Sequence, residues 1–154
     1  NGRSGRLLYL TTVIRLFFFY ISRKFKIITD GKLFFDGFLF SSAVGIGRFS
    51  GGGMQQMPEA VADDGLMDIT AIKRLNKFMV IRDFGKLYSG RIFENRSVIH
   101  AQAGKIEIDS TPASRIEIDG EIMGYSPFTF ELIPRCIRVV VGPKFRFSKQ
   151  DQHQ

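Results

Sequence analysis

Two alternating segments of nearly the same pattern constrain the fold of this chain more than any other feature. Residues 105–109 and residues 115–119 both place isoleucine at every second position between charged side chains. This period of two is the repeat of a β-strand with one buried face, because successive side chains point to opposite faces of a sheet. Only a short segment around Pro112 separates them, so we expect two neighbouring strands of one sheet.

Further strand-like segments lie before and after this pair. The turn signals Asp30-Gly31 and Asp36-Gly37 bound several of them, since glycine takes positive φ without steric cost. Sixteen glycines against five prolines also favour a domain with many tight turns. The additional strands are predicted at residues 25–29, 32–35, 38–44, 66–72, 128–132 and 137–141.

Two other segments show the helical period instead. In residues 4–24 apolar side chains recur three or four positions apart, and residues 77–89 follow Asn76, which can cap a helix, and precede Gly90, which can end one. The second helix carries an apolar stripe formed by Phe78, Ile81, Phe84, Leu87 and Tyr88. We therefore predict a mainly β domain of α+β type, a β-sandwich-like domain with an N-terminal helix and one inserted helix.

The charge balance limits the classes of partner. Lys and Arg outnumber Asp and Glu by 22 to 15, giving a net charge of +7, which favours polyanions such as nucleic acid, anionic membrane surfaces or nucleotide phosphates. The cations are spread along the sequence with no basic stripe interleaved with aromatics, so nucleic acid is disfavoured as a partner. The single cysteine, Cys136, is predicted to be a buried small residue of a reduced, cytoplasmic protein.

One acidic turn follows the second alternating segment. Asp119-Gly120 is a hairpin signal, and Glu121 comes directly after it. Two carboxylates therefore lie two residues apart at the end of a rigid strand. They are either placed for chemistry or are solvated turn residues, and the pattern alone leaves both interpretations open.

A second acidic cluster and a glycine-rich segment lie earlier in the chain. Asp63, Asp64 and Asp68 offer oxygen ligands that suit a hard cation such as Mg²⁺, although their spacing is not that of an EF-hand and turn residues often look the same. Residues 45–53 are rich in glycine, but no convincing helix follows them. A turn that needs positive φ is therefore favoured over a phosphate-binding loop.

Three segments occur in an order that resembles a known family. Residues 47–53 read Gly-Arg-Phe-Ser-Gly-Gly-Gly, residues 63–68 read Asp-Asp-Gly-Leu-Met-Asp, and residues 118–121 read Ile-Asp-Gly-Glu. Together they resemble the C-terminal half of the diacylglycerol kinase catalytic family, which includes bacterial lipid kinases and the sphingosine and ceramide kinases. The resemblance runs roughly over residues 5–141.

The resemblance implies a domain organisation and an activity. Family members have two domains, and residues 1–154 would form a single one, the C-terminal substrate-side domain, with residues 143–154 as a frayed tail. The N-terminal nucleotide-binding domain would be absent, because its Gly-Gly-Asp-Gly-Thr loop does not occur here. We expect ATP-dependent phosphoryl transfer to a lipid hydroxyl, with the isolated chain inactive. The alternative is a stand-alone β-rich module that binds lipid or an anionic surface without catalysis.

The resemblance also implies roles for residues of both acidic turns. Glu121 matches the general base that takes the proton of the lipid hydroxyl, and Asp119 is the second candidate residue of the catalytic site, either supporting Glu121 from outside the reacting groups or forming the turn. Asp64 matches a structural Mg²⁺ ligand, joined by the backbone carbonyls of Val61 and Leu66. ATP and its catalytic Mg²⁺ would be bound mainly by the missing domain.

The implied partners are a membrane lipid substrate and the missing nucleotide-binding domain, with no nucleic acid. A homodimer remains an alternative to a monomer. The implied location is cytoplasmic, peripheral to the inner face of the membrane.

Overall fold

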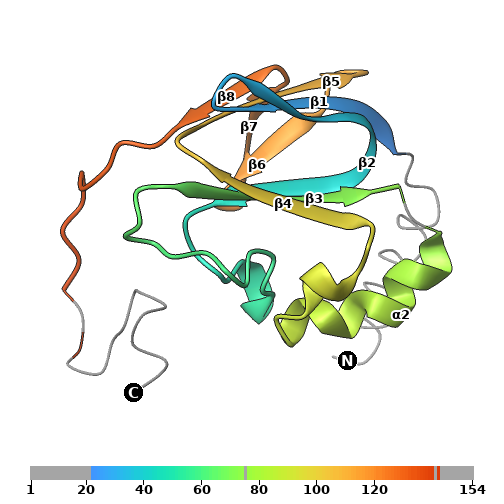
Figure 1. The fold of residues 1–154 in the computed structure, drawn as a ribbon, viewed down its shortest axis with the longest axis horizontal. Helices are drawn as coiled ribbons and strands as arrows, with labels where there is room; N and C mark the ends of the chain where they lie inside the picture. The colour runs from blue at the N-terminus through green and yellow to red at the C-terminus, as the bar shows by residue number, and fades with distance from the viewer. Residues whose placement is uncertain (1–21, 75, 141, 143–154) are drawn as a thin grey trace, which may run out of the picture.

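The computed structural model describes residues 22–74, 76–140 and 142, and their fold is mainly β (Figure 1). Eight strands, one α-helix and two short 3₁₀ helices lie in this part of the chain. They are β1 (Arg23–Thr29), β2 (Lys32–Gly45), η1 (Gly51–Gly53), β3 (Met67–Lys73), α2 (Lys77–Tyr88), η2 (Ile92–Glu94), β4 (Val98–Ala103), β5 (Lys105–Thr111), β6 (Arg115–Ile118), β7 (Glu121–Tyr125) and β8 (Phe128–Glu131).

The predicted β-sandwich-like class is confirmed, and so is the inserted helix. Asn76 accepts a hydrogen bond from the backbone N–H of Phe78 at 3.1 Å, as expected of a helix cap. Gly90 takes a positive φ of 70° just beyond the helix. The helix predicted at residues 4–24 lies almost wholly outside the described residues, and so does the tail 143–154. Within the described chain, α2 is too short and too polar to cross a bilayer.

One antiparallel sheet of six strands, in the order β4-β3-β2-β1-β5-β8, forms the body of the domain. Only Gly104 separates β4 from β5 in sequence, yet β4 pairs with β3 at one edge and β5 pairs with β1 and β8. The sheet must therefore curl, because β4 lies first and β5 lies fifth in its spatial order and only one residue connects them. In Figure 1, β3 and β4 cross below β1, β5 and β8.

The long strand β2 connects the two halves of this curl. Its first part pairs with β1 and its last part with β3, and Leu39 takes part in both registers. The prediction of two strands separated by a turn at Asp36-Gly37 is therefore wrong. Gly37 pairs with Phe25, and a Cβ at Gly37 would lie 3.0 Å from the ring of Phe35. This glycine makes room for an aromatic ring within a continuous strand.

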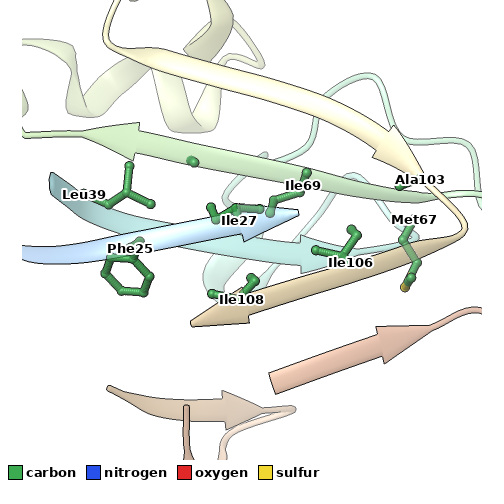
Figure 2. Close-up of a cluster of buried hydrophobic side chains, with 9 residues drawn as sticks. Phe25, Ile27, Leu39, Met67, Ile69, Ala103, Ile106 and Ile108 are labelled. Carbon is green, nitrogen blue, oxygen red and sulfur yellow. The ribbon is translucent and has the colours of Figure 1, made fainter. Parts of the chain in front are cut away.

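The hydrophobic core lies inside the curl (Figure 2). Alternate residues of five strands point into it, as the period of two predicts. Four of these side chains are fully buried: Ile27, Leu39, Ile69 and Ile106. The remaining buried members of the cluster are Phe25, Met67, Ala71, Ala103 and Ile108.

The second alternating segment behaves differently from the first. Strand β6 pairs with β7 in a separate two-stranded sheet, so the prediction that residues 105–109 and 115–119 are neighbours in one sheet is wrong. Ile116 is half-buried and Ile118 is 45% exposed. Among the described residues, no other part of the chain covers the apolar face of this hairpin, whereas the core covers that of β5. An alternating sequence predicts a strand but does not show whether another layer will pack against it.

The strand predicted at residues 137–141 is also wrong over its described part. Residues 137–140 form no strand, and Ile137, Val139 and Val140 are exposed. Cys136 is exposed as well, contrary to its predicted burial. An apolar run forms a strand only where a neighbouring edge can pair its backbone groups, and within the described chain these residues meet none.

We predict that Ile27→Ala lowers the free energy of unfolding by about 2–5 kcal/mol, because it leaves a cavity among fully buried side chains. The measurement is urea denaturation of the 154-residue chain. Leu33→Ala is the matched control, because Leu33 is mostly exposed and its truncation should change stability by roughly 0.5 kcal/mol or less. Equal losses for the two variants would contradict this placement of the core.

Candidate functional site

Glu121 is the first residue of β7, directly after the tip of the β6–β7 hairpin. Ile118 pairs with Glu121, so Asp119 and Gly120 form a two-residue loop, with φ values of 50° and 92°. Positive φ at both central residues is the geometry of a type I′ turn, whose twist matches that of the strands. The predicted turn is confirmed, and both carboxylates are exposed. The hairpin tip therefore presents both carboxylates to solvent.

Three serine side chains join this hairpin to the main sheet. Ser110, at the end of β5, hydrogen-bonds through its hydroxyl to the hydroxyls of Ser114 and Ser126, the latter at 2.7 Å. The Ser114 backbone N–H donates to the Ser110 hydroxyl at 2.8 Å, and the Ser126 N–H donates to the Ser114 carbonyl at 2.8 Å. Ser114 and Ser126 flank the two ends of the hairpin, so this serine joint clamps its base.

A second contact stiffens the hairpin near that base. Arg115 and Tyr125 are paired across β6 and β7, the Arg115 Nε donates to the Tyr125 hydroxyl at 3.0 Å, and the guanidinium carbon lies 5.5 Å from the centre of the ring. Both side chains are exposed. The sequence analysis identified neither this pair nor the serine joint, because nothing in the sequence shows which loops return to the end of β5.

The predicted metal-binding residues lie together in the loop before β3. The Asp64 carboxylate accepts the Leu66 N–H at 2.9 Å, and the Asp64 N–H donates to the Val61 carbonyl at 3.3 Å. Gly65 supplies the positive φ of 80° that this tight turn needs. The loop therefore brings Val61, Asp64 and Leu66 close to one another.

A neighbouring strand adds a residue to this loop. The Gln102 amide on β4 donates to the carboxylates of Asp64 and Asp68, both at 3.3 Å. Asp68 is buried and pairs with Gln102 across β3 and β4. The sequence analysis named both aspartates but missed Gln102, because only the strand register places it opposite Asp68. Asp63, the third aspartate of that cluster, is exposed.

The loop offers oxygen donors of the kind that bind a hard cation. No group of three or more His, Cys, Asp or Glu side chains suited to a metal occurs in the described part of the chain. A site would instead combine the Asp64 carboxylate with the backbone carbonyls of Val61 and Leu66, and with water. One carboxylate, carbonyls and water are a donor set that fits Mg²⁺ or Ca²⁺.

The glycine-rich segment forms a turn and leads into no helix. Gly52 and Gly53 have φ values of 71° and 82°, and the Ser50 N–H donates to the Met54 carbonyl at 2.8 Å across the turn. The expected use of glycine for positive φ is confirmed. A phosphate-binding helix N-terminus is not formed after this loop, since an irregular segment follows Met54.

Comparison with known proteins gives the same assignment as the sequence motifs. The chain is 33% identical over 118 residues to the probable lipid kinase YegS-like of Shewanella frigidimarina, and 27% identical over 122 residues to the diacylglycerol kinase of Bacillus subtilis. These alignments cover 75% and 79% of this chain but only 37% and 40% of the two relatives. The chain thus spans well under half the length of the relatives it matches.

The fold has a solved counterpart. A crystal structure of a diacylglycerol kinase from Bacillus anthracis superimposes with a TM-score of 0.61, covering 78% of this chain and 43% of that one. Its sequence identity is 23%, so this likeness concerns the fold alone. Residues 1–141 match the family model described as the YegS C-terminal NAD kinase beta sandwich-like domain. The resemblance seen in the motifs is confirmed, and the chain belongs to this family of lipid kinase C-terminal domains.

Proposed function

We propose that the chain is the lipid-substrate and general-base domain of an ATP-dependent lipid kinase of the diacylglycerol kinase type. Family membership supports the lipid kinase assignment. The observation that carries the finer proposal is Glu121, an exposed carboxylate at the tip of a hairpin clamped at its base by the serine joint.

In the proposed reaction Glu121 acts on the lipid hydroxyl. Its carboxylate accepts the hydroxyl proton while the hydroxyl oxygen attacks the γ-phosphorus of ATP, and the bond to the β-phosphate oxygen breaks to release ADP. Phosphoryl transfer depends mainly on positioning and charge neutralisation. A short arm with a fixed turn suits that task. Asp119 shapes the turn, since it holds positive φ one residue before Gly120.

The remaining partners of this reaction follow from the same proposal. ATP and its Mg²⁺ are bound mainly by the part of the enzyme that the relatives have beyond this domain, so the isolated chain is inactive. The acceptor is a membrane lipid, reached at the cytoplasmic face of the bilayer. A structural Mg²⁺ is held at Asp64 with the carbonyls of Val61 and Leu66, where it fixes the loop before β3.

We predict that Glu121→Gln, made in the complete polypeptide that carries this domain, lowers lipid phosphorylation by at least about 100-fold, because the amide cannot accept the proton. The measurement is transfer of labelled γ-phosphate from ATP to diacylglycerol in mixed micelles. Glu117→Gln is the control, since Glu117 is an exposed carboxylate of the same hairpin, and it should stay within about twofold of wild type. Unchanged turnover in Glu121→Gln would remove this residue from the base role.

We also predict that Mg²⁺ raises the melting temperature of the 154-residue chain through Asp64, because a ligand that binds only the folded state stabilises it. Each kcal/mol of binding should raise the melting temperature by about 2–4 °C. Asp64→Asn should abolish the rise, whereas Asp63→Asn, its exposed neighbour, should retain it. An equal rise in all three proteins, or none in wild type, would contradict the metal proposal.

A further inference from the structure

Helix α2 presents its apolar stripe to solvent. Phe78, Ile81, Phe84 and Tyr88 are 75%, 57%, 50% and 48% exposed. They recur at helical spacing and so share one face of the helix, and the rings of Phe84 and Tyr88 meet edge to face with their centres 5.7 Å apart. Of the five residues of the predicted stripe, only Leu87 is half-buried. We call the four exposed residues the outer stripe.

The inner face of this helix is mixed, because the charged residues Asp83 and Lys86 lie there beside the half-buried Val80 and Leu87. The Asp83 side chain is only 11% exposed, and its carboxylate accepts a hydrogen bond from the Asn95 amide at 3.0 Å. The Lys86 ammonium lies 3.6 Å from the Glu94 carboxylate of η2. A surface helix normally turns its apolar face inward and its charges outward. In α2 most of the large apolar side chains face outward instead.

Most of the excess positive charge of the chain belongs to the segment that contains α2 and the residues just before and after it. Residues 73–96 contain seven Lys and Arg against two Asp and Glu, a net +5 of the chain's +7. Both acidic residues are already paired, Asp83 with Arg82 at 2.9 Å and Glu94 with Lys86. Most of these cations are three to five positions apart in the sequence, so they form no continuous basic run and the cluster was not predicted.

Two of these seven cations, Arg74 and Arg96, adjoin backbone segments that meet at one end of this region. Lys73 at the end of β3 donates its backbone N–H to the Ser97 carbonyl at 2.8 Å. This bond places the backbone leading to Arg74 beside the backbone following Arg96. Both arginine side chains are exposed. The region therefore combines a solvent-facing aromatic stripe with unneutralised positive charge, at the opposite side of the molecule from β5 and β8 in Figure 1.

We propose that α2 is the element through which this chain docks on the surface of an anionic lipid bilayer. The outer stripe enters the interface between headgroups and acyl chains, and the exposed arginines of residues 73–96 meet the anionic headgroups. A second copy of this chain fits poorly on the same face, because it would bring two segments of net +5 together. The choice of a bilayer as the partner rests on the proposed lipid kinase function.

The first test is sedimentation of the 154-residue chain with vesicles of phosphatidylcholine, alone or mixed with phosphatidylglycerol. Binding should require phosphatidylglycerol and weaken with salt.

The double variant Phe78→Ser with Phe84→Ser should bind at least about tenfold more weakly, because it removes two inserting rings. Arg74→Gln with Arg96→Gln should lose about fivefold for each charge. The control Ile133→Ser with Ile137→Ser alters two strongly exposed apolar residues outside α2 and should bind as wild type does.

A second measurement reports on insertion directly. The chain has no tryptophan, so Phe84→Trp places a single fluorescent probe in the outer stripe and Ile137→Trp places one outside it. Phosphatidylglycerol vesicles should shift the emission of the first probe to the blue and leave the second unchanged. Blue emission from Phe84→Trp before lipid is added would overturn the proposal, since it means that another part of the chain or a second copy covers the stripe. Vesicle binding without any shift would overturn it as well.

The outcomes separate this proposal from the proposed function. Glu121→Gln should leave vesicle binding unchanged while abolishing phosphoryl transfer in the complete polypeptide. Retained vesicle binding without any kinase activity would contradict only the kinase assignment. Two results would contradict only the docking role of α2, provided that the complete polypeptide is fully active on lipid. The first is that the wild-type chain does not bind vesicles, and the second is that the double variant Phe78→Ser with Phe84→Ser binds them as well as wild type does.

Discussion

The corner at Gly104 is the constraint on which the rest of this fold depends. A single residue joins the first strand of the sheet to the fifth, so the sheet has to close on itself and enclose a core. Asp30, in the turn between β1 and β2, pins the corner: its carboxylate accepts the Lys105 N–H at 2.8 Å, and its own N–H donates to the Lys105 carbonyl at 2.9 Å. Hydrogen bonds between two residues that are distant in sequence therefore hold this corner, and the buried isoleucines fill the space that the closed sheet encloses.

The two proposed functional elements depend on this sheet in different ways. The hairpin that carries Glu121 is attached where β5 ends, through the hydroxyl of Ser110. Helix α2 leaves the sheet after β3, and the chain returns through η2 to β4. Neither element contributes to the main core cluster. This separation leaves the exposed carboxylate and the outer stripe of α2 available to a substrate and to a lipid surface.

Local chemistry made part of the structure predictable from the sequence. The alternation at residues 105–109, the Asp119-Gly120 turn and the Asn76 cap depend on neighbours in sequence, and all three are confirmed. Where the outcome depended on distant partners, the predictions were wrong. Asp36-Gly37 has the sequence of a turn, but both residues pair with β1 inside a continuous strand. Residues 137–140 have the sequence of a strand, but within the described chain they pair with no strand edge. The orientation of α2 and the serine joint likewise depend on contacts that no local pattern encodes.

If the serine joint fixes the hairpin that carries Glu121, breaking it should loosen that hairpin alone, and hydrogen exchange of the Ser110→Ala chain measures this. Removing a hydroxyl that is buried and shared by Ser114 and Ser126 costs roughly 1–3 kcal/mol. The amides of β6 and β7 should therefore exchange at least about fivefold faster than in wild type, while those of β1 keep their protection. Unchanged exchange in the hairpin, or equal acceleration in β1, would contradict this role of the serine joint.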